Sequence, residues 1–126
     1  MSTKTVAEKI FLRQGKRVFF FNAPDNLGKL LGGIPEGVIA TEDDTVDIVL
    51  AFIENYKQLE KHLIGLKDRL KPKGALWIAY HKGTSSIDTD INRDSIIEFA
   101  MKHQLKGVAM VSINDNWSAL RLKIIH

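Results

Sequence analysis

The chain of 126 residues contains no cysteine and only three prolines. Without cysteine there is no disulfide, no thiolate metal site and no cysteine nucleophile. Because proline interrupts helices and sheets, its scarcity leaves long segments able to form regular structure. Hydrophobic residues make up 44% of the chain and charged residues 26%, the proportions of an ordinary globular protein. We expect one folded domain that spans residues 1–126.

A long hydrophobic segment is also missing. The longest uncharged apolar run extends from Ile48 to Ile53, far short of the roughly 20 residues that a membrane-spanning helix needs. No export signal is visible at the amino terminus. We therefore expect a cytoplasmic protein without a membrane partner.

Residue patterns for metal binding and for common nucleophiles are absent. The four histidines lie far apart, and none has a carboxylate at the spacing of metal ligands. No G-x-S-x-G motif indicates a serine nucleophile. His81 follows a predicted central strand and is the histidine best placed for proton transfer, but we favour a packing role for it. We predict no catalytic residue, no metal and no cofactor, so an enzyme is the less favoured interpretation.

A glycine-rich cofactor loop is missing as well. Residues 23–30 nearly match the phosphate loop G-x-x-x-x-G-K-[ST], but Ala23 replaces the first glycine and Leu30 replaces the magnesium-binding hydroxyl. Pro24 also removes a backbone amide from the turn. No G-x-G-x-x-G motif gives a dinucleotide close access to the backbone. Nucleotide hydrolysis is not expected, and we interpret the acidic residues 42–44 as a solvated turn rather than a ribose-binding site.

Positive charge is present but spread along the chain. The 18 lysines and arginines exceed the 15 acidic residues, which gives a net charge of +3. The densest basic cluster is Lys67, Arg69, Lys71 and Lys73, at the end of a predicted helix, where it complements the negative end of the helix dipole. We predict a solvated face there and do not expect nucleic acid as a partner.

Apolar runs without alternation indicate strands that are covered on both faces. They occur at residues 17–22 and 47–52, and further strands are predicted at 38–40, 75–80, 108–113 and 120–125. Helical spacing predicts an opening helix of about two turns that starts at Thr5 and stops at Gly15. A short helix is predicted over 27–31 and longer ones over 54–70 and 92–104, with Pro72 forcing the end of the helix over 54–70.

Strands that alternate with helices predict an α/β fold with a mostly parallel, Rossmann-like sheet. The turn residues Asn114, Asp115 and Asn116 predict that the sheet closes with an antiparallel hairpin strand. In open α/β sheets, ligands bind outside the carboxyl ends of the strands. The loop over residues 82–94 is therefore the main candidate for a binding site.

This loop is rich in hydroxyl groups and charges. Lys82 and Arg93 are suited to hold an anion, to which Thr84 and Ser85 would donate hydrogen bonds. The alternative is a self-capped connection, in which Asp90 caps the next helix and Arg93 pairs with a nearby aspartate; Asn92 is the other candidate for that cap. The predicted ligand-binding residues are Lys82, Thr84, Ser85, Thr89, Asp90, Arg93 and Asn22.

An aromatic residue opens the predicted last strand. Trp117 at such a position most often seals a sheet edge or an interface, and Arg121 is a polar neighbour on the same strand. Trp117 and Arg121 are therefore the predicted interface residues. A homodimer is one partner that this prediction leaves open.

Four motifs cover most of the chain. K-x-T-S-x-I-x-T-D-x-x-R-D spans residues 82–94, W-S-A-L-R spans 117–121, G-x-R-V-x-x-x-x-A-P spans 15–24 and I-P-E-G-V spans 34–38. With these motifs the chain resembles a family of small bacterial single-domain proteins of unknown function. That resemblance implies a bacterial protein but supplies no activity.

The stretch L-K-P-K-G-A-L at residues 70–76 resembles the L-K-P-G-G-x-L turn of class I S-adenosylmethionine-dependent methyltransferases. The closing hairpin strand fits that fold. The glycine-rich cofactor loop does not match, and residues 38–47 leave no room for one of the fold's strand–helix units. The resemblance implies a truncated methyltransferase-like sheet.

Three functions follow from these patterns. We favour a non-catalytic or regulatory module that binds a small anionic ligand or a protein partner at the carboxyl ends of the strands. The first alternative is a divergent S-adenosylmethionine-dependent, methyltransferase-like enzyme that uses His81 or Asp90. The second alternative is a self-associating structural subunit, with Trp117 and the last strand at a two-fold interface.

Overall fold

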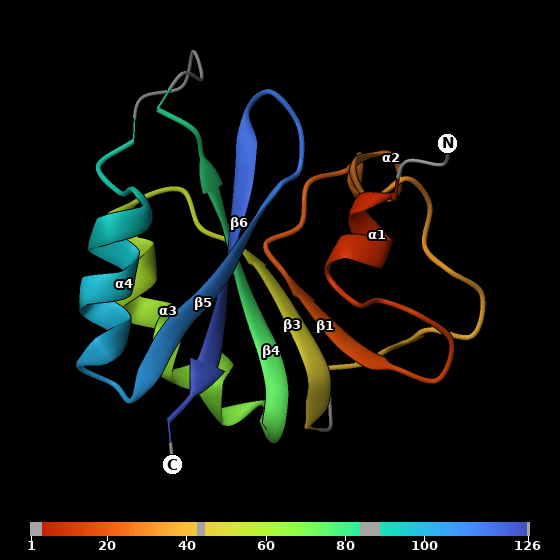
Figure 1. The fold of residues 1–126 in the computed structure, drawn as a ribbon, viewed down its shortest axis with the longest axis horizontal. Helices are drawn as coiled ribbons and strands as arrows, with labels where there is room; N and C mark the ends of the chain where they lie inside the picture. Colours follow the sequence, from red (N-terminus) through yellow and green to blue (C-terminus); the bar gives the residue numbers. More distant parts are fainter. Residues whose placement is uncertain (1–3, 43–44, 84–88, 126) are drawn as a thin grey trace.

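The structure is a computed structural model that describes residues 4–42, 45–83 and 89–125. Its helices are α1 (Val6–Lys9), α2 (Leu27–Leu31), α3 (Tyr56–Asp68) and α4 (Arg93–Met101). Its strands are β1 (Arg17–Phe21), β2 (Ile39–Ala40), β3 (Val46–Phe52), β4 (Leu70–His81), β5 (Leu105–Ser112) and β6 (Trp117–Ile124). Figure 1 shows the strands in one twisted layer, with α1 and α2 on one side and α3 and α4 on the other.

The six strands form a single mixed sheet in the order β2-β1-β3-β4-β6-β5. β1 pairs in parallel with β2 and β3, and β3 pairs in parallel with β4. β6 runs antiparallel to both β4 and β5. The predicted α/β fold class, with a mostly parallel sheet and an antiparallel hairpin strand, is confirmed.

The connection from β2 to β3 is short. β2 ends at Ala40 and β3 begins at Val46, which leaves too few residues for a further strand and helix, since a parallel crossover needs a dozen or more. The sheet is therefore the truncated form that the sequence predicted.

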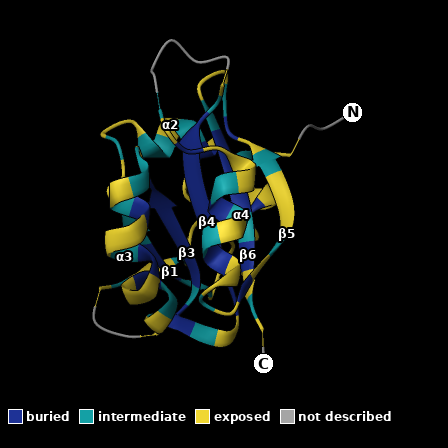
Figure 2. Ribbon diagram, turned by 90° about the vertical axis from the view of Figure 1, so that its left-hand side faces the viewer, coloured by how far each residue is buried: buried dark blue, intermediate teal, exposed yellow. Residues whose placement is uncertain are grey.

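Both faces of the central strands are covered by apolar side chains. On one face, Leu59 and Leu63 of α3 pack with Val49 and Ile78. A second apolar cluster, on the other face, joins residues of α1, α2 and the strands. Burying one such leucine or isoleucine contributes about 1.5–3 kcal/mol. Figure 2 shows β3 and much of β4 as buried, which explains why the sequences of these strands do not alternate.

Helix α1 is shorter than the sequence predicted. Thr5 and Glu8 form the predicted capping box at its start. The helix ends after Lys9 because Phe11 adopts a left-handed conformation, with φ of 66°. Gly15, the predicted stop, lies beyond that point. The prediction of two helical turns is therefore wrong.

Helix α3 also ends earlier than predicted, at Asp68 rather than at Leu70. Leu70 already pairs with Val46, and the next pair is Ala75 with Ile48. The register shift places residues 71–74 in a bulge within β4. A side chain at Gly74 would clash there, since a Cβ would lie 2.8 Å from the carbonyl oxygen of Asp47.

The last strand does not lie at an edge of the sheet. β6 is flanked by β4 and β5, so β2 and β5 are the edge strands. Of the two roles predicted for Trp117, sealing a sheet edge is wrong, because the final hairpin inserts its second strand next to β4. The other role, at an interface, stays a prediction. Among the described helices, none combines the length and the apolar composition required to span a membrane.

Candidate functional site

Asn22 follows β1 at the carboxyl edge of the sheet. Its backbone is left-handed, with φ of 55°, and its Nδ2 donates a hydrogen bond of 3.0 Å to the carbonyl oxygen of Phe52. The side chain thus ties the end of β1 to the end of β3. Pro24 follows two residues later, and its carbonyl accepts from the amide of Leu27 at 3.1 Å. The turn that a glycine-rich loop would occupy is closed by the chain's own contacts.

Thr89 and Asp90 hold the crossover loop to the start of α3. Asp90 Oδ1 accepts from the amide of Tyr56 at 2.7 Å. Thr89 Oγ1 donates to the carbonyl of Glu54 at 2.8 Å, and Asn55 caps the same helix by accepting from the amide of Gln58. Two of the first three amides of α3, those of Tyr56 and Gln58, therefore already have side-chain acceptors, and Thr89 and Asp90 have structural roles.

The alternative sequence interpretation had Asp90 capping the helix that follows it. Instead, Asn92 caps α4 and forms a capping box with Ser95, whereas Asp90 caps α3. The expected pairing of Arg93 with a nearby aspartate is present, since its Nε lies 3.3 Å from Asp94 Oδ1. Thr84 and Ser85, the two predicted hydroxyl donors, lie outside the described residues.

Lys82 and Arg93 lie at the carboxyl edge on the face that α4 covers. Lys82 Nζ donates to Ser112 Oγ at 2.7 Å. Ser112 is the cross-strand partner of Ser118, which in turn pairs with Tyr80. Directly opposed residues point to the same side of a sheet, so these hydroxyl groups share the face with Lys82.

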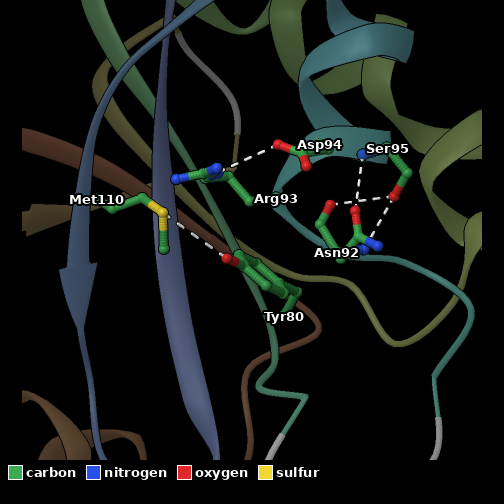
Figure 3. Close-up of polar contacts among 6 residues, drawn as sticks. All are labelled: Tyr80, Asn92, Arg93, Asp94, Ser95 and Met110. Atoms are coloured by element: carbon green, nitrogen blue, oxygen red, sulfur yellow. Dashed lines mark hydrogen bonds and ion pairs between the residues drawn. The ribbon is translucent and has the colours of Figure 1, made fainter.

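Arg93 reaches the same group from the start of α4. Figure 3 shows its side chain near Tyr80 and Met110, and the Tyr80 hydroxyl lies 3.9 Å from Met110 Sδ. We name the set formed by Tyr80, Lys82, Arg93, Ser112 and Ser118 the Tyr80 cluster. It gathers two cations and three hydroxyl groups from β4 and the residue that follows it, β5, β6 and α4.

Burial raises the pKa of the Tyr80 hydroxyl above its ordinary value of 10.0, and the positive charge of Arg93 opposes that rise. The hydroxyl is therefore protonated at neutral pH and able to donate a hydrogen bond. It is a hydrogen-bonding group of the cluster rather than a base.

His81 points to the other face and is enclosed. Its side chain is buried, its ring lies 3.9 Å from the ring of Trp117, and Trp117 meets Phe52 edge-on at 5.1 Å. His81 Nδ1 has no hydrogen-bond partner among the residues that the structure describes. A buried imidazole beneath an indole has poor access to a substrate, which supports the packing role.

The two predicted interface residues lie on one face of β6 but contact different neighbours. Trp117 begins β6 and covers His81, whereas Arg121 lies four positions later, roughly 13 Å along the strand at about 3.3 Å per residue. There the Arg121 guanidinium stacks on Phe11, 5.1 Å from the ring centroid. Within the described ranges, no group of three or more histidine, aspartate or glutamate residues is arranged to hold a metal.

Sequence reasoning missed the three hydroxyl residues Tyr80, Ser112 and Ser118. A signal for them existed in the predicted hairpin, because an antiparallel pairing of the last strands aligns alternate residues on one face. Using that signal required the register and the order of the strands, which single segments do not encode.

No family model matches this chain, and no curated protein sequence matches it. Solved structures do match in fold. A ribosomal protein L11 methylase from Lactobacillus delbrueckii subsp. bulgaricus aligns with a TM-score of 0.64 at 12% identity, covering 94% of this chain and 74% of that one.

Two further structures give the same result. An S-adenosylmethionine-dependent methyltransferase from Aquifex aeolicus aligns with a TM-score of 0.59 at 15% identity, covering 95% of this chain and 88% of that one. An rRNA methylase from Streptococcus thermophilus aligns with a TM-score of 0.60 at 10% identity, covering 100% and 99% of the two chains. At such identities the likeness establishes a methyltransferase-like fold, and a fold does not carry an activity.

Proposed function

We propose that this chain is a non-catalytic or regulatory module that binds a small anionic ligand at the Tyr80 cluster. One observation carries the proposal: Lys82 contacts Ser112, Arg93 lies near Tyr80, and Ser118 pairs with both hydroxyl residues, all at the carboxyl edge, where open α/β sheets take their ligands. Two cations and several hydroxyl donors form charge-assisted hydrogen bonds to carboxylate or phosphate oxygens.

The contacts that Lys82 and Arg93 make within the protein are weak. The side chains of Arg93 and Asp94 are 59% and 83% exposed, and an exposed ion pair contributes at most about 1 kcal/mol. Lys82 donates to a neutral hydroxyl on an exposed residue. An anion that reaches both cations replaces weak contacts with stronger ones.

The non-catalytic character rests on the contacts of Asn22, Thr89 and Asp90. Each of these polar groups holds one segment of the protein to another. Pro24 occupies the turn in which a methyltransferase of this fold would need glycines for its cofactor. The groups left for a ligand are therefore the cations and hydroxyls of the Tyr80 cluster, which bind but do not transfer a group.

The test is isothermal titration calorimetry with inorganic phosphate and with citrate, preceded by native mass spectrometry of untagged protein to detect a retained molecule. The Lys82→Ala/Arg93→Ala double variant should lose at least tenfold in affinity for the bound anion. The matched control is Lys57→Ala/Lys102→Ala, which removes two exposed charges elsewhere. Equal affinity of both double variants would refute the proposal.

The similarity to three methylases favours one alternative, a divergent enzyme that binds S-adenosylmethionine in an altered way. Calorimetry with S-adenosylmethionine and with its demethylated product separates the two functions. Heat of binding that survives the Lys82→Ala/Arg93→Ala change would favour the enzyme, whereas no heat with either compound would count against it.

A further inference from the structure

A second site lies at the end of the sheet where the parallel strands begin, opposite the carboxyl ends. A cavity of about 360 Å³ opens between the chain that follows α1, the start of β3, the bulge of β4 and Arg121 of β6. It is on the face covered by α1. Lys82 of the Tyr80 cluster lies seven positions beyond Ala75 of the cavity wall, roughly 23 Å away along the strand. The two sites are therefore separate.

The residues that line this cavity carry a net positive charge larger than that of the complete chain. Its charged residues are Arg13, Lys16, Lys71, Lys73, Arg121 and Asp47. Five cations and one carboxylate give the wall a net charge of +4, against +3 for the complete chain, so all other residues together carry −1. The bulge at residues 71–74 and the turn after α1 bring together cations that are far apart in the sequence.

The single carboxylate is already neutralised. Asp47 accepts from the amide of Arg17 at 2.9 Å and pairs with Lys71 at 3.3 Å. Burial acts to raise the pKa of Asp47, but these two partners and the nearby positive charge of Lys16 outweigh it, and the pKa lies below its ordinary value. No carboxylate in the described part of the chain pairs with Arg13, Lys16 or Lys73.

Arg121 has a buried donor in need of an acceptor. Its Nε is buried and has no hydrogen-bond partner among the described residues, and the same is true of Nε1 of Trp77, its cross-strand neighbour. The ring of Phe11 contacts both side chains. Its centroid lies 6.4 Å from that of the Trp77 ring and 5.1 Å from Cζ of Arg121. A buried guanidinium nitrogen without an acceptor, beside a cluster of cations, favours an anion in the cavity.

Phe11 itself is an unusual residue for its position. It follows the cap of α1, with its amide bonded to the carbonyl of Glu8 and the amide of Leu12 bonded to Ala7. A helix end of this pattern prefers glycine at the left-handed residue, yet a phenylalanine with φ of 66° stands here, 47% exposed. The exposed ring at the rim offers a stacking surface.

We infer that this cavity binds the phosphate of a nucleoside phosphate, with the base stacked on the exposed surface of Phe11. Phosphate oxygens provide the acceptors and the negative charge that the wall lacks. An aromatic ring beside a basic groove is the arrangement that binds single-stranded nucleic acid, and a free nucleotide presents the same two groups. The inference does not depend on the Tyr80 cluster.

The experiment is calorimetry at low salt with three probes: inorganic phosphate, AMP and a single-stranded oligothymidylate. Arg13 and Lys73 are suitable for truncation because neither has an ion-pair partner in the described ranges. Arg13→Ala/Lys73→Ala should weaken AMP and oligonucleotide binding at least tenfold. Lys57→Ala/Lys102→Ala removes the same amount of charge outside the cavity and should leave both affinities within about twofold.

The stacking contact has its own test. Phe11→Leu should weaken AMP and the oligonucleotide but not inorganic phosphate, and Phe11→Trp should restore them. Affinity that rises with oligonucleotide length identifies a strand as the source of the phosphate, and equal affinity for AMP and oligonucleotide identifies a free nucleotide. Absence of binding by both nucleoside probes, or equal losses in the two double variants, would overturn the inference.

Discussion

Asp90 accepts a hydrogen bond of 2.7 Å from the amide of Tyr56, which lies 34 positions earlier in the chain. This contact fixes the end of the crossover loop to the beginning of α3. Among the described residues of this loop, Thr89 and Asp90 hold the fold together, whereas Lys82 and Arg93 belong to the Tyr80 cluster. The binding proposal therefore rests on these two cations and the hydroxyl groups of that cluster.

The first prediction concerns this contact. Asp90→Ala should lower the free energy of unfolding by about 1 kcal/mol, the usual loss when a helix start loses its side-chain acceptor. Asp94→Ala, which removes a carboxylate from an exposed ion pair, should change it by less than about 0.5 kcal/mol. Urea unfolding measures both, and an equal effect of the two variants would contradict the role of Asp90.

Two glycines provide a matched pair for a second prediction. A Cβ at Gly74 would lie 2.7 Å from Leu70 Cδ1 and 2.8 Å from the Asp47 carbonyl, whereas a Cβ at Gly65 meets nothing within 4 Å. Gly74→Ala should therefore destabilise the protein by about 1–3 kcal/mol. Gly65→Ala, within α3, should stabilise it by about 0.5–1 kcal/mol. Thermal unfolding of both variants shows whether each substitution lowers or raises the stability. An unchanged stability of Gly74→Ala would mean that the bulge relaxes to accommodate the added methyl group.

Local patterns predicted much of the fold. The unbroken apolar run of β3 indicated a strand covered on both faces, and the Thr5–Glu8 spacing indicated a helix start; both are present. The insertion of β6 between β4 and β5 was not predicted. Strand order depends on which faces and edges remain uncovered after the rest of the sheet forms, and no single segment carries that information.

The grouping of the basic residues also could not be predicted from single sequence segments. The sequence cluster that ends α3 separates in the structure: Lys67 donates to the carbonyl of His103 and Arg69 stacks on Phe19. Lys71 and Lys73 join the cavity instead. Charge counted along the chain predicted a solvated face, but the bulge of β4 turns part of it toward Arg121.

A third prediction follows from the lowered pKa of Asp47. Because the folded-state pKa lies below the unfolded value, the ionised carboxylate stabilises the fold above that unfolded value, near 3.8, and this contribution is lost as pH falls through the folded pKa. Asp47→Asn should therefore be less stable than the parent at pH 6, with the difference shrinking below about pH 4. Urea unfolding across this range measures it, and a difference independent of pH would contradict the argument.

The fourth prediction links Tyr80 to the proposed ligand. Burial raises its pKa and Arg93 lowers it, so the raised folded value contributes stability that is present below pH 10 and lost as pH rises through the folded pKa. Ultraviolet titration resolves this group, since Tyr80→Phe leaves only Tyr56 to ionise in a chain with two tyrosines. Arg93→Ala should raise the Tyr80 pKa further, and an anion bound beside Arg93 should do the same in the parent protein by cancelling its positive charge. A ligand that binds without moving the Tyr80 titration would place its site elsewhere, even if calorimetry detects its binding.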